Sequence, residues 1–160
     1  KEFKKIIKDL VNNLKLRNNI FVHRDFHVSN LMLVKEKIGI IDSQDALIGN
    51  RAYDLASFVD DVRLKTSESL KKKMFNFYLS TNKNINKKKF KNDFEILSVL
   101  RNLKIIGIFS RLAIRDGKIK YLKLIPYAWK LISIRIDKNK VFKDLNNLLN
   151  QNFKKELNAN

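Results

Sequence analysis

The feature that most constrains this chain is the stretch of residues 23–61, where a polar loop leads into a hairpin pattern. Two short apolar runs, residues 31–34 and 38–41, flank the charged residues 35–37. Apolar runs of this length around a tight turn predict a β-hairpin. Asp42 comes directly after the second run, so the hairpin would return it to the loop before the first.

That loop contains Asp25 and Asn30, so the predicted hairpin gathers three oxygen-bearing side chains at one point. Phosphoryl transfer asks the protein mainly for positioning and for neutralisation of phosphate charge. Mg²⁺ prefers oxygen ligands, usually one or two carboxylates together with phosphate oxygens. We therefore expect Asn30 and Asp42 to bind Mg²⁺ and Asp25 to accept the proton of an acceptor hydroxyl.

The motifs HRDFHVSNLM and IGIIDSQDALIGNRAYDLAS resemble the aminoglycoside phosphotransferase and choline kinase family, distant relatives of protein kinases. The resemblance covers residues 18–132 and includes the later segment GIFSRLAIRDGKIKYLKLIP. Within the family, the motifs are most similar to those of bacterial amino-sugar kinases, which phosphorylate N-acetylmuramate and N-acetylglucosamine at the anomeric hydroxyl in cell-wall recycling. Aminoglycoside and choline-type kinases are the alternatives.

The resemblance implies an ATP- and Mg²⁺-dependent phosphotransferase with an alcohol acceptor. It also implies an α+β, mainly α-helical fold: the C-terminal lobe of a protein-kinase-like fold, with a small β-hairpin carrying the catalytic loop. A protein kinase has Phe-Gly after the metal-binding aspartate, whereas this chain has Ser43 and Gln44. That difference favours a small-molecule kinase.

Several further residues receive roles from the resemblance. His23 and Arg24 are interpreted as bracing the loop, and Asp54 as a scaffold that hydrogen-bonds the loop backbone. The candidates for substrate binding are His27, Gln44, Asp45, Asp61, Arg111 and Arg115. Structural alternatives stay open for most of them: a loop contact for the histidine, a brace or cap for Asp45, an exposed helix acid for Asp61, and a surface ion pair for the arginines.

The domain organisation follows from where the loop motif lies in the chain. In kinases the phosphate-covering loop, the strand lysine and its helix glutamate precede this motif, and only 22 residues do so here. We expect residues 1–150 to be the catalytic and acceptor-binding lobe, residues 151–160 a polar tail, and the N-terminal nucleotide lobe to be absent from this chain. Both a fragment of a longer enzyme and a natural truncation fit, and we expect this part alone to be inactive. A non-catalytic binding module on a degenerate kinase lobe is the rival interpretation.

The remaining chain has mainly helical periodicity. A turn is expected at Gly49–Asn50, and the lysine clusters at residues 71–73 and 87–89 are interpreted as solvated helix faces. The predicted helices cover residues 2–15, 51–64, a segment starting near Ser67, 87–115, a segment starting at Pro126, and 141–149.

The amino-acid composition limits which kinds of binding partner we expect for this chain. The chain has 34 Lys and Arg against 16 Asp and Glu, a net charge of +18. Because basic residues occur throughout the chain, a general bias explains the charge better than one nucleic-acid-binding stripe. A scarcity of acids weighs against a polycationic aminoglycoside as acceptor. With no cysteine and no apolar run long enough for a bilayer, we expect a cytoplasmic protein whose partners are ATP and a small molecule. The oligomeric state and the choice between ATP and GTP stay open.

Overall fold

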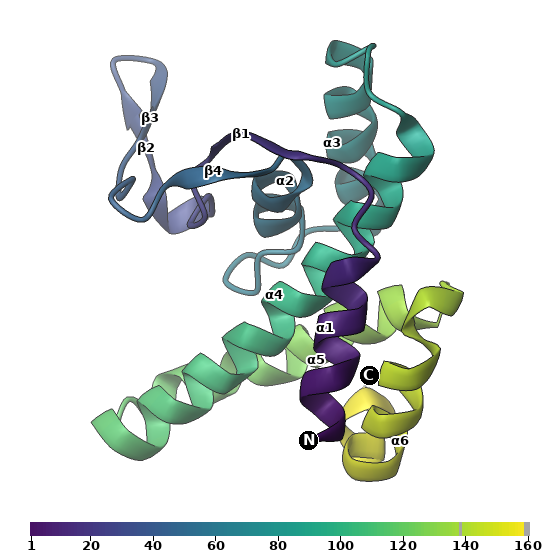
Figure 1. The fold of residues 1–160 in the computed structure, drawn as a ribbon. Coiled ribbons are helices and arrows are strands. Elements are labelled where there is room, and N and C mark those ends of the chain that lie inside the picture. Colours follow the sequence, from purple (N-terminus) through teal and green to yellow (C-terminus); the bar gives the residue numbers. More distant parts are fainter. Residues whose placement is uncertain (138, 159–160) are drawn as a thin grey trace. The chain divides into compact units, whose positions relative to one another are not determined.

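The computed structural model describes residues 1–137 and 139–158, which are mainly helical with two small antiparallel sheets (Figure 1). This confirms the expected α+β, mainly helical class. The chain divides into two compact units. Lys15–Leu97 form the unit that contains the strands, here called the loop unit. Lys1–Leu14 and Ser98–Asn160 form the helical unit, and helix α4, Lys87–Asp116, runs through both.

The predicted hairpin is confirmed in the loop unit. Strand β2, Leu31–Val34, pairs antiparallel with strand β3, Lys37–Ile40, and Leu31 lies opposite Ile40. Lys35 and Glu36 connect them with φ values of 45° and 63°. A two-residue turn with both φ values positive matches the right-handed twist of the flanking strands, although Asn-Gly is the usual sequence for it.

The expected turn at Gly49–Asn50 is wrong, because both residues belong to strand β4, Leu47–Asn50. This strand pairs antiparallel with strand β1, Asn18–Val22. A Cβ at Gly49 would lie only 3.1 Å from Val22 Cγ2. The glycine therefore permits a close approach between the two strands, which is a role glycine often has inside a strand.

The helices of the loop unit largely follow the predicted pattern. Helix α2, Ala52–Val59, ends earlier than the expected residue 64, because the side chains after it bind backbone groups instead of extending the helix. Helix α3, Glu68–Thr81, begins after Ser67, whose Oγ accepts a hydrogen bond from Leu70 N at 3.2 Å. A Ser at this position satisfies a free N–H group of the first turn, as expected from the sequence.

In the helical unit, α1, Glu2–Asn12, and α5, Ile125–Ile136, both pack against α6, Lys143–Asn158. Trp129 of α5 is buried and stacks on Phe153 with ring centroids 5.3 Å apart. Helix α6 thus extends beyond the predicted residue 149 into the segment expected to be a polar tail. The other elements of this unit are the 3₁₀ helices η2, Ile119–Leu124, and η3, Lys140–Phe142.

The β2–β3 hairpin exposes apolar side chains to solvent, with Leu33 74% and Ile38 65% exposed.

The expectation that the lysines at residues 71–73 are all solvated is wrong, because Lys71 is only 3% exposed. None of the helices among residues 1–137 and 139–158 is long and apolar enough to cross a membrane.

Candidate active site

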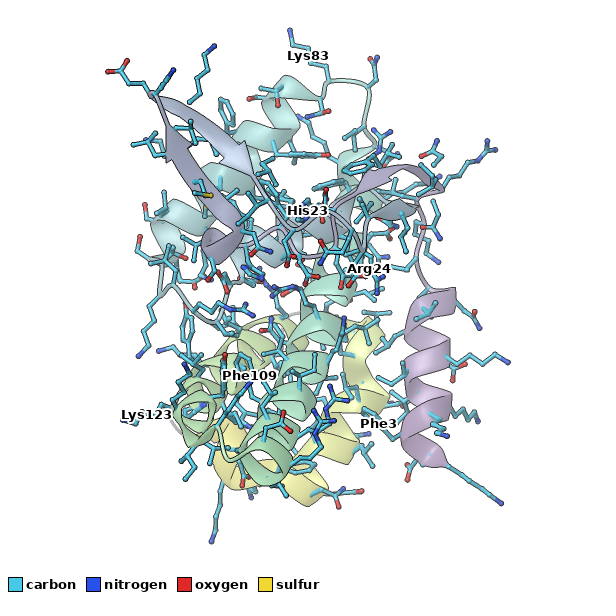
Figure 2. All side chains as sticks on the ribbon, turned by 90° about the vertical axis from the view of Figure 1, so that its left-hand side faces the viewer. Phe3, His23, Arg24, Lys83, Phe109 and Lys123 are labelled. Atoms are coloured by element: carbon cyan, nitrogen blue, oxygen red, sulfur yellow. The ribbon has the colours of Figure 1, made fainter. Side chains whose placement is uncertain are left out.

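The first half of the site is the loop of residues 23–30, which begins after β1 and ends with the 3₁₀ turn η1, Val28–Asn30. Asp54, in the first turn of α2, accepts hydrogen bonds from His23 N at 2.7 Å and from Arg24 N at 3.0 Å. Arg24 has a φ of 72°, a left-handed conformation that costs energy for a residue with a Cβ. The two bonds to Asp54 help to hold the backbone there. Figure 2 labels the side chains of His23 and Arg24.

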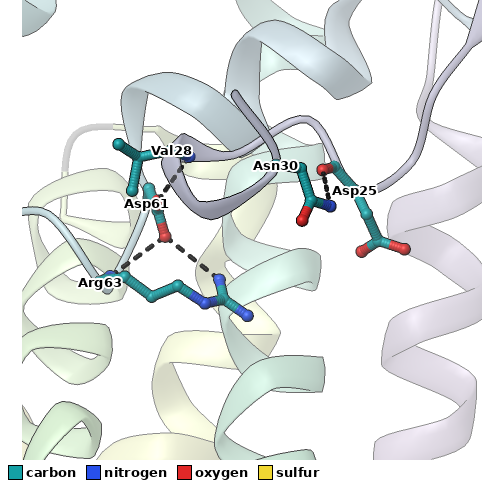
Figure 3. A network of polar contacts seen from close by, with 5 residues as sticks. All are labelled: Asp25, Val28, Asn30, Asp61 and Arg63. Atoms are coloured by element: carbon teal, nitrogen blue, oxygen red, sulfur yellow. Dashed lines mark hydrogen bonds and ion pairs between the residues drawn. The ribbon is translucent and has the colours of Figure 1, made fainter. Parts of the chain in front are cut away.

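Asn30 joins the loop to the hairpin end. Its side chain is buried, and Nδ2 donates to the backbone oxygen of Asp25 at 2.9 Å (Figure 3). The same Nδ2 lies 3.4 Å from Asp42 Oδ2. Since these contacts use only the amide nitrogen, they leave Oδ1 of Asn30 as an acceptor. The structure therefore brings Asn30 together with Asp42 and with the backbone of Asp25.

Asp42 follows β3 and is held at the loop by its neighbours. Ile41 N donates to Asn30 O at 3.1 Å, and His23 Nε2 lies 3.0 Å from Ile41 O. Because a carbonyl can only accept, the buried imidazole carries its proton on Nε2 in this contact. Asp42 itself is exposed, has a φ of 70°, and accepts from Gln44 Nε2 at 2.7 Å.

The donor set suits Mg²⁺. The carboxylate of Asp42 and the amide oxygen of Asn30 are hard ligands, and Mg²⁺ commonly binds one or two carboxylates while phosphate oxygens and water complete the octahedron. Among the residues that the structure describes, no cluster of three or more His, Asp or Glu is placed to hold a metal ion. Asn30 and Asp42 thus fit a Mg²⁺ ion whose other ligands would be phosphate oxygens and water.

The remaining substrate candidates fall into different places. Arg24 NH1 donates to the backbone oxygen of Asp45 at 3.3 Å, while the side chain of Asp45 is exposed. His27 is buried, and its backbone N donates to Asp25 O at 3.0 Å. These residues lie in or next to the 23–30 loop.

The two arginine candidates lie in the helical unit, outside the unit that contains the loop. Arg111 is exposed, and Arg115 forms an exposed ion pair with Asp116, Nε to Oδ1 at 2.6 Å. The hydrogen bond between the partners raises the pKa of Arg115 above its usual value and lowers that of Asp116.

The alternative that Asp61 is an exposed helix acid is wrong, and its neighbour Asp60 is buried as well. Asp60 and Asp61 lie just after the end of α2 and are 0% and 2% exposed. Asp60 Oδ1 pairs with the buried Lys71 Nζ at 2.9 Å, and that ammonium also donates to Val59 O at 2.8 Å. Asp61 accepts from Val28 N and Arg63 N instead. Lys71 and Val28 come from other segments, so local spacing did not reveal these two contacts.

Sequence reasoning also missed Asp93, which is 0% exposed on α4. Its carboxylate accepts from Lys15 N at 2.8 Å, from Leu16 N at 2.9 Å and from Asn50 Nδ2 at 2.8 Å. It thereby ties the residues before β1 to the end of β4. One signal was available, since Asp93 lies three residues after Phe90 on the apolar face of the predicted helix.

The structure thus gathers a loop aspartate, a neighbouring amide and a second aspartate at a hairpin end in one part of the loop unit. Residues 1–85 match the model of the phosphotransferase enzyme family, and the chain belongs to that family. The resemblance inferred from the motifs is thus confirmed.

The chain is also similar to curated proteins that share one name. The chain is 36% identical over 126 residues to an N-acetylmuramate/N-acetylglucosamine kinase of Neisseria meningitidis, which covers 75% of the chain and 38% of that protein. Proteins of the same name match in Caulobacter vibrioides, 32% identical over 120 residues (72% of the chain, 33% of that protein), and in Pseudomonas aeruginosa, 32% over 153 residues (92% and 45%). The chain thus spans less than half the length of these relatives.

Proposed function

We propose that this chain carries the catalytic and acceptor-binding part of an ATP- and Mg²⁺-dependent kinase that phosphorylates a hydroxyl of an amino sugar. The observation that carries the proposal is the position of Asn30, whose amide contacts both the backbone of Asp25 and the carboxylate of Asp42. In this proposal residues 1–150 correspond to the C-terminal lobe of a protein-kinase-like fold.

Each of the three residues has a separate task. Asn30 Oδ1 and the carboxylate of Asp42 would hold Mg²⁺, which when bound neutralises phosphate charge. Asp25, half-buried in the loop, would orient the acceptor hydroxyl and take up its proton. The short contacts between loop and hairpin support this division, because they keep the base and the metal ligands in one place before substrate arrives.

The braces around the loop contribute through positioning. Asp54 fixes the backbone at His23 and Arg24, and the His23 imidazole links the loop to Ile41, the residue before Asp42. A catalytic constellation has to be held within about 0.5 Å of its productive geometry. We infer that these contacts bring the proposed base and the proposed metal ligands to that precision.

For the acceptor, we propose N-acetylmuramate or N-acetylglucosamine. The proposal rests on the names of the curated relatives and on the small number of acids, 16 against 34 basic residues. A polycationic antibiotic would need an acidic pocket. Gln44 and Asp45, both exposed beside Asp42, are the candidates for contacting the sugar hydroxyls.

Two experiments on the full-length protein test the proposal. In the first, ADP release is measured with N-acetylmuramate, N-acetylglucosamine, choline and kanamycin as acceptors. We expect the amino sugars to give the highest kcat/KM. Preference for choline or kanamycin would overturn the acceptor, and absence of turnover with all of them would favour a non-catalytic module.

In the second, Asp25→Ala is compared with Asp9→Ala, an exposed aspartate of α1 in the helical unit. Loss of the general base should lower kcat by roughly 10²–10⁴-fold. The Asp9 variant should keep full turnover, and both proteins should melt at the temperature of the unmodified protein. Near-normal turnover of the Asp25 variant would refute its assigned role.

A further inference from the structure

Two adjacent buried carboxylates lie just after α2 but make contacts with different parts of the loop unit. Asp60 pairs with Lys71 of α3. Asp61 turns to the 23–30 loop and to its own neighbour Arg63 (Figure 3). Neither acid has a role in the proposed chemistry so far, although burying a carboxylate is costly unless it is paired and hydrogen-bonded.

Both oxygens of Asp61 are engaged. Oδ2 accepts from Val28 N at 3.3 Å, while Oδ1 accepts from Arg63 N at 3.1 Å and from the Arg63 guanidinium at 3.2 Å. The side chain of Asp61 is 2% exposed, and that of Arg63 is 29% exposed. The arginine thus balances the buried charge from the solvent side. With its side chain only 2% exposed, Asp61 offers almost no surface to a sugar hydroxyl.

The bond to Val28 matters because Val28 begins the short turn that ends at Asn30. These two are the first and last residues of the 3₁₀ turn η1. Asn30 N also donates to His27 O at 2.9 Å, which closes the turn. Because the turn is only three residues long, a bond at its first N–H restrains the backbone from which the Asn30 side chain extends. That side chain carries the amide that meets Asp42.

We propose that Asp61, charge-balanced by Arg63, is a positioning residue that holds the η1 turn and thereby aims Asn30 at the metal. The inference builds on the proposed function, since it concerns the same Mg²⁺ ligand. It replaces the substrate-binding role considered for Asp61 from the sequence. Contacts of this kind behind a ligand typically change metal affinity or activity by about 10–100-fold.

Asp60 offers a matched control for Asp61, because it is adjacent and equally buried and forms its ion pair with Lys71 of α3. The variants Asp61→Asn and Asp60→Asn are made in the full-length protein, together with Arg63→Gln, which leaves the carboxylate in place. The first measurement is amide hydrogen exchange at Val28 and Asn30 without metal or nucleotide. We expect at least about tenfold faster exchange at Val28 in Asp61→Asn, an intermediate effect in Arg63→Gln and none in Asp60→Asn.

The second measurement is the Mg²⁺ concentration that gives half-maximal turnover. Asp61→Asn should raise it about tenfold while the acceptor KM stays within about twofold, and Asp60→Asn should leave both unchanged even if its melting temperature falls. A raised acceptor KM with unchanged exchange at Val28 would overturn the proposal in favour of substrate contact. Equal exchange in the Asp60 and Asp61 variants would overturn it in favour of general destabilisation. Because the exchange experiment needs no turnover, it tests the brace even if the proposed kinase activity fails.

Discussion

The 23–30 loop and the β2–β3 hairpin each supply one proposed Mg²⁺ ligand, but the protein holds them in different ways. The loop is fixed from behind through its backbone, by Asp54 at one end and Asp61 at the other. The hairpin exposes apolar side chains. The carboxylate of Asp42, which follows the hairpin, accepts hydrogen bonds from the side-chain amides of Asn30 and Gln44 in the described part of the chain.

This difference indicates that the loop is held more rigidly than the hairpin and contributes more to the geometry of the candidate site. Backbone bonds to buried carboxylates restrict a segment more than contacts between side chains at the surface do, since the latter compete with water. We therefore expect changes behind the loop to alter both stability and activity, and changes in the hairpin to have smaller effects on stability.

The largest effect is expected for Lys71→Met. The change removes the ammonium that pairs with Asp60 and caps Val59 O, and it leaves a buried carboxylate without its cation. Removing one partner of a buried pair costs about 3–5 kcal/mol. Urea unfolding followed by circular dichroism measures the loss. The double variant Lys71→Met/Asp60→Leu should recover much of it, and a loss below about 1 kcal/mol would show that the pair is not buried.

The next largest effect is expected for Asp54→Ala. Two loop N–H groups lose a charged acceptor, which should cost about 2–4 kcal/mol in the free energy of unfolding. Unlike Lys71→Met, this change should also lower kcat, because the backbone of the loop is released. Both kcat values are measured under conditions where both variants are folded. If Asp54→Ala lowered stability but had the same kcat as Lys71→Met, the proposed difference between the loop and the rest of the unit would be contradicted.

A smaller change of opposite sign is expected in the hairpin turn. Lys35 and Glu36 both adopt positive φ values, which Asn and Gly adopt at lower cost. The variant Lys35→Asn/Glu36→Gly should raise the free energy of unfolding by about 0.5–1 kcal/mol, with kcat unchanged. A control with Lys37→Asn, which lies in β3, should give no gain. A loss of stability in the turn variant would contradict the positive-φ turn.

The smallest effect is expected for the exposed pair Arg115–Asp116. Pairing lowers the pKa of Asp116, so its contribution is present above the pKa of the unfolded state and is lost as the pH falls through the lower folded pKa. Asp116→Asn should leave the melting temperature at neutral pH unchanged within error and slightly flatten its fall in acid. A clear drop at neutral pH would contradict the expectation that exposed ion pairs contribute little.

How far the sequence predicts this molecule depends on the range of the interactions. The hairpin, the capped start of α3 and the loop motif depend on residues that are neighbours in the sequence. The family assignment, which rests on the sequence motifs, is confirmed. The pairing of β4 with β1 places Leu47 opposite Val22, and no local sequence pattern predicts it. The Lys71–Asp60 ion pair is likewise not predictable from local sequence, because a lysine within a lysine cluster is expected to face solvent.

The candidate site was predictable to a similar extent. Spacing predicted that Asp25, Asn30 and Asp42 lie close together, and the structure joins the Asn30 amide to the backbone of Asp25 and to the carboxylate of Asp42. Spacing did not predict the bond between Asp61 and Val28, which lie far apart in the chain. Sequence spacing therefore predicts which groups meet at the site, and the structure adds the contacts that hold them there.

The most direct test of the account is where a metal–nucleotide complex binds. Mn²⁺ replaces Mg²⁺ in the full-length protein with ATP, and the side-chain amide signals of Asn30 and Gln44 are followed by ¹H–¹⁵N NMR. Their contacts to Asp42 predict that both signals broaden beyond detection on saturation and stay sharp in Asp42→Asn. Signals that stay sharp in the unmodified protein at saturating Mn²⁺–ATP would contradict the account.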